Sequence, residues 1–368
     1  PYGGAVKRRE LGKALCLLLT MLLLLAGGLI SYENAFMEKR PEYDRMCDAA
    51  RRMEACMAEI KAERLRRGLP VDETEDIFST GLLGTGHTAI TTTLGNLEAK
   101  RTSCQRDMGA LVLRLLLEAG VKAGDRVGIC ASGSFPALNI ALFCALDALE
   151  AQPAAIISIG ASTYGANLPE FTAPEMLYHL YGKGLVSTAP LYATLGGDGD
   201  MGQNMGAAFF EEEQAVLEQT LTRLETAGIP LVCIPDRQEN LVWREQVYGD
   251  IDCFVSIGGQ SMAMGAHEEG YALGQGVLRQ QRVKNGESFL LGHYLNLDIP
   301  VIVLLNVRTL CAEYGLPFDP IALAPIGENA LYYKKTCPKV PVLLALGLGA
   351  GMLLLYRRWF VWKGKNQE

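Results

Sequence analysis

The stretch Asp125–Ile159 reads DRVGICASGSFPALNIALFCALDALEAQPAAIISI and decides the fold class. Its two ends, Asp125–Ala131 and Ala154–Ile159, are short continuous apolar runs, which is typical of strands buried on both faces. The segment between them, Phe135–Glu150, is long and apolar enough to be a helix. A strand, a helix and a second strand in this order indicate a parallel βαβ unit.

Helix-like and strand-like segments keep alternating along most of the chain. Further helices are predicted at Leu111–Ala119, Thr172–Tyr181, Phe209–Ala227 and Gln238–Val247, and further strands at Leu231–Ile234, Cys253–Ile257 and Val301–Leu305. Apolar strands that alternate with helices predict a mostly parallel sheet covered on both faces. We therefore expect an α/β fold, with a mostly parallel three-layer (Rossmann-like) sheet domain over residues 71–339.

Two long apolar segments flank this domain. Ala14–Ile30 and Val340–Tyr356 each hold 17 residues without a charge, at the lower end of the range of about 17–25 residues for a spanning helix. The alternatives are a cleaved signal peptide for the first and a buried core helix for the second. No small-residue cleavage motif follows the first, and the basic and aromatic run Arg357–Trp359 borders the second. We expect transmembrane helices at 14–31 and 340–356.

The charges around these segments predict an orientation. The positive-inside rule favours cytoplasmic tails at 1–13 and 357–368, and hence a two-span protein of the cell membrane whose large domain is extracytoplasmic. Residues 32–70 are expected to hold an amphipathic helix that forms a stalk or packs on the domain. Nine of the ten cysteines fall within 32–339 without a CxxC pair. That pattern favours free thiols, and so a reducing exterior or the opposite orientation.

The composition excludes two classes of protein. Hydrophobic residues make up 49% of the chain and charged residues 20%, which is not the composition of a disordered protein. The net charge of −7 argues against a nucleic-acid partner, because nucleic-acid binders carry a basic face. The lipid bilayer is the partner that the apolar segments predict.

The turn after the first predicted strand contains Ser132, Gly133 and Ser134. It is not a phosphate-binding P-loop, because Ser134-Phe135 stands where Lys-Ser/Thr is required, and it lacks the Gly-x-Ser-x-Gly frame of a hydrolase nucleophile. Small residues with hydroxyl groups at a helix N-terminus can bind an anion or a carboxylate. The alternative is that Ser132 or Ser134 only caps the helix.

The turn after the second strand has the same character, and a polar tract rich in threonine precedes both. Side chains and glycines that either contact a ligand or only satisfy these turns are Ser162, Thr163, Gly165, Asn167, Thr91 and Thr92. Because carboxyl ends of neighbouring parallel strands meet at one edge, both turns are expected to face one crevice. The tract Thr91–Gly95 is expected to be a loop folded over that crevice or else an ordinary strand. Further glycine-rich turns lie at Leu195–Asp200 and Ile257–Ser261.

The four histidines are the remaining candidates for acid–base chemistry. His87 and His267 lie near glycine-rich turns, where either could be a general base. The sequence His267-Glu-Glu lacks the second histidine of a zinc protease motif, and Asp198-Gly-Asp200 is more often a turn than a cation site. We expect no metal site, and no motif demands a cofactor.

Three of these stretches, read together, resemble the poly-γ-glutamate system protein family. They are Thr91-Thr-Thr-Leu-Gly95 with Ala99-Lys-Arg-Thr102, then Ser132-Gly-Ser-Phe-Pro-Ala-Leu-Asn139, then Gly160-Ala-Ser-Thr-Tyr-Gly-Ala-Asn167. The resemblance covers roughly residues 80–330 as an ordered series. It implies a bacterial protein associated with poly-γ-glutamate, a capsule polymer, and it implies a cellular process and location rather than a reaction.

Three functions are compatible with the resemblance. The first is a membrane-anchored accessory protein of poly-γ-glutamate synthesis or export, whose glycine-rich turns bind glutamyl carboxylates or a synthase or export subunit. The helix N-termini near Gly133 and Gly165 would receive the carboxylates, with help from Lys100 and Arg101. The second is a hydrolase or transferase acting on γ-glutamyl amides, with Ser132 or Ser134 as nucleophile and His87 or His267 as base. The third is a purely structural scaffold of a membrane complex.

Overall fold

The computed structural model describes residues 2–267 and 269–365, and it divides the chain into two compact units. One unit joins the two ends of the chain, up to Arg40 and from Tyr333 onward. The other unit is Pro41–Tyr332 and contains the sheet. The described chain is therefore an α/β protein with its apolar terminal segments gathered in a unit of their own.

The large unit is built on a six-stranded sheet of order β4-β3-β2-β5-β7-β6, in which β6 alone is antiparallel to its neighbour. The strands are β2 (Arg126–Ala131), β3 (Gln152–Ser158), β4 (Tyr192–Thr194), β5 (Cys253–Ile257), β6 (Gly276–Leu278) and β7 (Val301–Leu304). Cys130 of β2 pairs with Ile156 on one side and with Ser256 on the other, so β2 and β5 are central. All five residues of β5 are buried, which explains its unbroken apolar sequence.

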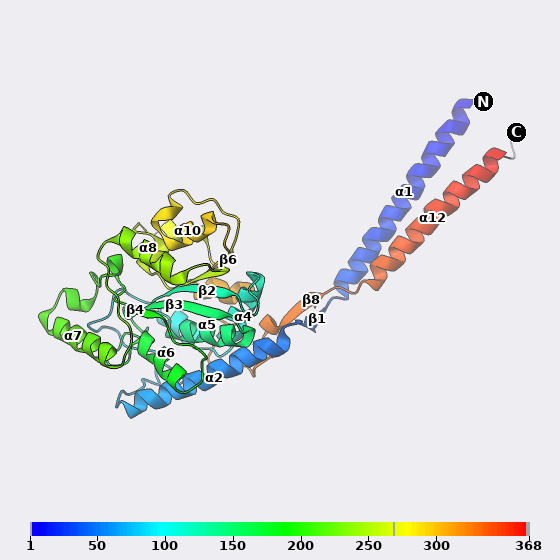
Figure 1. Cartoon of the computed structure of the whole chain (residues 1–368). Coiled ribbons are helices and arrows are strands. Elements are labelled where there is room, and N and C mark those ends of the chain that lie inside the picture. The colour runs from blue at the N-terminus through cyan, green and yellow to red at the C-terminus, as the bar shows by residue number, and fades with distance from the viewer. Residues whose placement is uncertain (1, 268, 366–368) are drawn as a thin grey trace. The chain divides into compact units, whose positions relative to one another are not determined.

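Helices cover both faces of this sheet. Figure 1 shows α8 and α10 on one face and α4, α5 and α6 on the other, and the packing contacts of α8 with β2 and β3 and of α5 with β3 agree. The helices of this unit are α2 (Tyr43–Arg66), α3 (Leu97–Ser103), α4 (Met108–Glu118), α5 (Pro136–Leu149), α6 (Ala173–Gly182), α7 (Glu211–Thr226), α8 (Arg237–Tyr248), α9 (Ser261–Met264), α10 (Leu290–Asn296) and α11 (Val307–Tyr314). The α/β fold and the mostly parallel sheet predicted from the sequence are confirmed.

The amphipathic helix α2 belongs to the large unit. Its apolar face, with Met46, Ala49, Ala50, Met53 and Met57 buried, packs on α4 and α5. A stalk would leave that face exposed. Of the two alternatives for this segment, packing on the domain is the one that the structure supports, and the domain begins at Pro41 instead of residue 71.

One predicted strand is wrong, and two short strands of the sheet were not predicted. Leu231–Ile234 is not a strand, because its extended backbone makes one bridge, from Leu231 to Ala193 at the edge of the sheet. Two three-residue strands, β4 and β6, were not predicted, since three residues carry too little periodicity to stand out from a loop.

The unit formed by the chain ends contains two long helices and a short ribbon. Its elements are α1 (Tyr2–Glu33), β1 (Phe36–Lys39), β8 (Tyr333–Thr336) and α12 (Val340–Lys365). The helices contain segments, Leu11–Glu33 and Val340–Trp359, that are long and apolar enough to cross a membrane. Only 17% and 11% of these segments are buried, which is not the burial of a core helix.

The two long helices pack on each other through small residues. A Cβ added to Gly27 would lie 2.7 Å from the Cβ of Ala345, and one added to Gly349 would lie 2.7 Å from the Thr20 side chain. The adjacent Gly28 has nothing within 4 Å of such an atom. At the end of α1, Ser31 Oγ donates to the carbonyl oxygen of Pro338 at 2.6 Å. Close helix contact at these glycines is the packing that apolar helices use in membranes.

Candidate functional site

A cavity of about 570 Å³ opens at the carboxyl ends of the parallel strands. It lies where the strand order reverses: the chain leaves β2 toward β3 on one side, and β5 neighbours β2 on the other. Three parts of the chain line it. The segment before α3 and α3 itself contribute Thr92, Thr93, Leu94, Gly95, Asn96, Ala99 and Lys100, and the end of β3 and the turns after β2 and β3 contribute Ser132, Ser134, Phe135, Ser158, Gly160 and Ser162. Later segments contribute residues that include Gly197, Asp198, Asn204, Gly259, Gln260, Ser261, Tyr271, Asn306, Arg308 and Phe318. This is the position at which open α/β sheets bind ligands.

Ser132 and Ser134 do not cap the helix that follows them. The N-cap of α5 is Phe135, and it receives no side-chain capping bond. Ser132 Oγ instead accepts from the backbone N–H of Ser134 at 3.3 Å, and the side-chain amide of Asn139 on α5 donates to the Ser132 carbonyl oxygen at 3.0 Å. The capping alternative is therefore wrong: Ser132 stabilises its own turn, and Ser134 reaches the next one.

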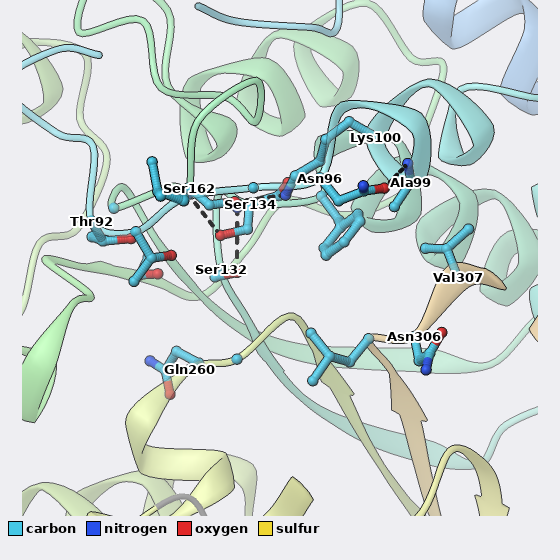
Figure 2. A pocket seen from close by; sticks show the side chains of 18 of the residues that line it. Thr92, Asn96, Ala99, Lys100, Ser132, Ser134, Ser162, Gln260, Asn306 and Val307 are labelled. Atoms are coloured by element: carbon cyan, nitrogen blue, oxygen red, sulfur yellow. Dashed lines mark hydrogen bonds between the residues drawn. The ribbon is translucent and has the colours of Figure 1, made fainter. Parts of the chain in front are cut away.

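The two glycine-rich turns are joined by direct contacts. Ser162 N–H donates to Ser134 Oγ at 3.0 Å, and Gly133 N–H donates to the Gly160 carbonyl oxygen at 3.1 Å. A Cβ on Gly165 would lie 2.8 Å from the Ser134 carbonyl oxygen, so this close approach requires glycine. Figure 2 shows Ser132, Ser134 and Ser162 linked in a row on one wall, with Gln260 and Asn306 across from them. The expectation that both turns face one crevice is confirmed.

Lys100 of α3 is the most unusual side chain of this wall. It is only 2% exposed, and Nζ donates to Ser162 Oγ at 2.7 Å and to the carbonyl oxygen of Ser134. The same ammonium group lies 3.7 Å from the centroid of the Phe135 ring. Burial lowers the pKa of Lys100 to about 7, and the nearby Cys104 thiol offsets this effect only in part. A buried amine that is half charged at neutral pH is uncommon outside functional sites.

Several predicted ligand residues support the loop above the cavity and do not line it. Asn167 accepts from the backbone N–H of Thr85 at 2.9 Å and donates to Thr91 Oγ1 at 2.9 Å. Thr163 Oγ1 accepts from Gly95 N–H at 2.7 Å. These bonds hold the segment 84–95 as a loop over the site, as predicted, apart from one bridge between Thr91 and Ala161. Of this tract's two predicted ligand threonines, Thr92 lines the cavity.

Three predicted residues lie away from the cavity lining. His87 is exposed and its Nε2 lies 3.1 Å from a carboxylate oxygen of Glu213 at the start of α7. His267 is exposed, and its backbone N–H donates to the Glu269 carboxylate. Arg101 forms a bidentate pair with Asp319, at 2.7 and 2.6 Å. The structure thus provides neither histidine as a base for the cavity serines.

The Asp198-Gly-Asp200 turn is built around a buried ion pair. Asp200 Oδ2 lies 2.6 Å from an Arg244 nitrogen, and the two side chains are 1% and 0% exposed. Asp200 Oδ1 also accepts from Thr194 Oγ1 at 2.9 Å and from Gln260 Nε2 at 3.2 Å. Since this carboxylate is saturated by protein donors, the turn acts as structure, and it fixes Gln260 at the cavity wall.

Several polar or basic residues of the cavity were not predicted as site residues, among them Ser158, Gln260, Asn306 and Arg308. Ser158 at the end of β3 is 1% exposed, and its hydroxyl has no partner among the described residues. Gln260, Asn306 and Arg308 follow β5 and β7. A signal existed for the first three, because polar residues at the ends of apolar strands face the same edge of the sheet.

The cavity is more basic than the chain as a whole. Its lining holds two basic side chains, Lys100 and Arg308, and one acidic side chain, Asp198, whose carboxylate accepts from Asn204 Nδ2 at 3.2 Å. Arg308 is exposed, and its guanidinium stacks 4.0 Å from the centroid of the Phe318 ring. In a chain of net charge −7, a lining with more basic than acidic side chains is a local exception. Such a cavity suits a small anionic or carboxylate-bearing ligand with groups that can hydrogen-bond to hydroxyls.

Comparisons with protein-family models, with curated proteins and with solved structures found no match. The inference about function therefore depends on the geometry of the cavity and on the sequence resemblance.

Proposed function

We propose that this chain is a membrane-anchored accessory protein of poly-γ-glutamate synthesis or export, and that its cavity binds glutamyl units of the polymer. The observation that carries the proposal is the position of Arg308, an exposed guanidinium on a cavity lined by serine hydroxyls, for which the described residues provide no ion pair. Each γ-linked glutamyl unit presents a free carboxylate beside an amide. Arginine recognises carboxylates, and the serine hydroxyls suit the amide.

The cavity accounts for selective binding despite the acidity of the chain. A net charge of −7 repels a polyanion at long range, so binding must come from contacts inside the cavity. Arg308 at the exposed rim is the group that we assign to the carboxylate.

The strand order supports a Rossmann-like assignment for the sheet domain. Numbered in chain order, the five parallel strands lie across the sheet in the order 3-2-1-4-5.

The membrane anchors are α1 and α12, with both tails in the cytoplasm and Pro41–Tyr332 outside. Packing of α1 on α12 supports an uncleaved anchor, since a signal peptide that is removed has no use for complementary contacts such as Ser31 with Pro338. Their mostly exposed apolar surfaces suit contact with lipid. In this arrangement the cavity meets the polymer at the outer surface of the cell membrane.

Calorimetric titration of the full chain in detergent micelles with a γ-linked glutamate pentamer tests the proposal. We expect binding by the wild type, at least about tenfold weaker binding by Arg308→Gln, and weakening at high salt. Lys122→Gln is the matched control, because Lys122 is an exposed basic residue outside the cavity. Equal affinities for wild type and Arg308→Gln, or no binding by a folded wild type, would contradict the proposal and favour the scaffold alternative.

A further inference from the structure

We propose that Ser162 and Lys100 form a nucleophile–base pair that cleaves γ-glutamyl amide bonds bound in the cavity. This inference rests on the proposed function for its substrate, and it adds a reaction to that function. Ser162 Oγ and Lys100 Nζ are 2.7 Å apart, within the distance over which a base takes the proton of a serine hydroxyl. Both residues line the cavity.

Ser162 is distinguished from the other serines of the cavity by this basic partner. Ser132 Oγ accepts from a backbone N–H, Ser134 Oγ accepts from another, and Ser261 Oγ donates to the Gly197 carbonyl oxygen at 3.2 Å. The sequence-based hydrolase hypothesis named Ser132 or Ser134 with a histidine. The geometry points instead to Ser162 with a lysine.

The surroundings of Lys100 orient it as a base. A carbonyl oxygen can only accept, so the bond to the Ser134 carbonyl oxygen fixes one N–H of the amine in that direction. In the neutral amine, the lone pair is then available to the Ser162 hydroxyl. Burial against the Phe135 ring lowers the pKa to about 7, which leaves the neutral form well populated at physiological pH. Arg308 binds the glutamyl carboxylate, so Lys100 is not held charged by it.

A buried hydroxyl without a partner supports the presence of a ligand in the same cavity. Ser158 is 1% exposed, lines the cavity, and has no hydrogen-bond partner among the described residues. Leaving a buried hydroxyl unpaired costs about 1–3 kcal/mol. A polar ligand atom in the cavity, such as an amide oxygen, removes that cost.

The reaction is an acyl transfer to serine followed by hydrolysis. Ser162 Oγ attacks the carbonyl carbon of the γ-amide while Lys100 Nζ accepts the hydroxyl proton. The carbon–nitrogen bond breaks, the leaving amine takes the proton from Lys100, and an ester to Ser162 remains. Water then adds to the ester carbon and gives a proton to Lys100. The bond between this carbon and Ser162 Oγ breaks, Oγ takes the proton from Lys100, and the shortened chain leaves with a new carboxyl group. Water is the one co-reactant required.

Reaction of the full chain in micelles with a fluorophosphonate probe tests the pair without relying on the polymer. We expect a covalent adduct on Ser162, identified by peptide mass spectrometry, and none in Ser162→Ala. Lys100→Met should slow labelling at least about 100-fold, as expected for loss of a general base, whereas Lys122→Met, which alters an exposed lysine, should not slow it. In the wild type the rate should rise with pH and level off above about pH 7. That profile remains informative if Lys100→Met fails to fold.

Two further measurements separate this inference from the proposed function. Ser162→Ala should still bind the γ-linked pentamer by calorimetry, whereas only the wild type should shorten it, as detected by mass spectrometry. A wild type that binds the pentamer but is never labelled at Ser162 overturns the pair and leaves the proposed function intact. Labelling of Ser162 that is independent of Lys100 and of pH also overturns the nucleophile–base pair. Labelling of Ser162 without cleavage of the pentamer overturns the assignment of γ-glutamyl amides as the substrate.

Discussion

Ser162 Oγ lies 2.7 Å from Lys100 Nζ, although the two residues are 62 positions apart in the chain. The contact joins the turn after β3 to helix α3, which precedes the sheet in the sequence. Lys100 also binds the Ser134 carbonyl oxygen, so one amine connects both glycine-rich turns. Lys100 is also the more deeply buried of the two basic side chains that line the cavity.

Replacement of Lys100 by methionine should change how stability depends on pH. The pKa of Lys100 is lowered to about 7 in the folded protein and returns to the ordinary value of 10.5 on unfolding. Between these values the unfolded chain binds more protons, so this residue makes the free energy of unfolding rise with pH by about 1.4 kcal/mol per unit. Denaturant unfolding at pH 7, 8 and 9 should show that rise in wild type relative to Lys100→Met. If the free energies of unfolding of wild type and Lys100→Met depend on pH in the same way, a buried Lys100 amine with a lowered pKa is contradicted.

Removing one partner of the buried Asp200–Arg244 ion pair should strongly destabilise the protein. Asp200→Asn leaves the fully buried Arg244 without a counter-charge, which should cost about 3 kcal/mol in the free energy of unfolding. The matched control is Asp298→Asn, which breaks the exposed pair with Arg282 at 3.5 Å and should cost less than about 1 kcal/mol. Chemical denaturation of both variants measures the difference, and similar losses would argue against the buried network.

Neighbouring glycines in α1 should respond differently to a larger side chain. Gly27→Val forces new atoms against Ala345 and the Pro341 carbonyl oxygen, whereas Gly28→Val enters open space. Pairing of α1 with α12 can be followed by oxidation of Met352→Cys, since Cys16 Sγ lies 3.9 Å from the backbone oxygen of residue 352. Gly27→Val should slow disulfide formation between Cys16 and the new thiol, and Gly28→Val should not. Equal rates in both variants would contradict the helix contact.

The cysteines provide a direct test of membrane orientation. All ten are free thiols, as the sequence predicted, and Cys233 and Cys337 are the exposed ones. If the large domain is extracytoplasmic, a membrane-impermeant maleimide should label Cys233 in intact cells, and Cys233→Ser should remove that label. Labelling of Cys233 only after the membrane is permeabilised would reverse the orientation.

The fold was largely predictable because its central strands are buried on both faces. Continuous apolar runs such as Cys253–Ile257 have no other stable position than the middle of a covered sheet, so pattern alone predicted β5. Edge elements lack that constraint. Leu231 makes one bridge where a strand was predicted, and Tyr192–Thr194 forms a strand too short to carry a pattern. Their conformations depend on neighbours that the local sequence does not contain.

The sequence predicted where the site lies in the fold, but not which side chains contact one another there. Hydroxyls after β2 and β3 converge because parallel strands end at one edge, and this predicted Ser132, Ser134 and Ser162 together. Lys100 and Arg101 were indistinguishable in sequence, yet adjacent residues on a helix point in different directions. One turns into the cavity, and the other pairs with Asp319. Tertiary packing also places both predicted histidines, His87 and His267, outside the cavity lining.

Hydrogen–deuterium exchange of the full chain, measured with and without a γ-linked glutamate pentamer, tests whether the cavity is the glutamyl site. We expect slower exchange in the segments that line the cavity, at 92–100, 132–135 and 158–162, and little change in α2 or α7. An α-linked pentaglutamate of equal charge serves as the control and should protect these segments less. Unchanged exchange at saturating pentamer, or protection confined to surfaces away from the cavity, would contradict the assignment of the cavity as the glutamyl site.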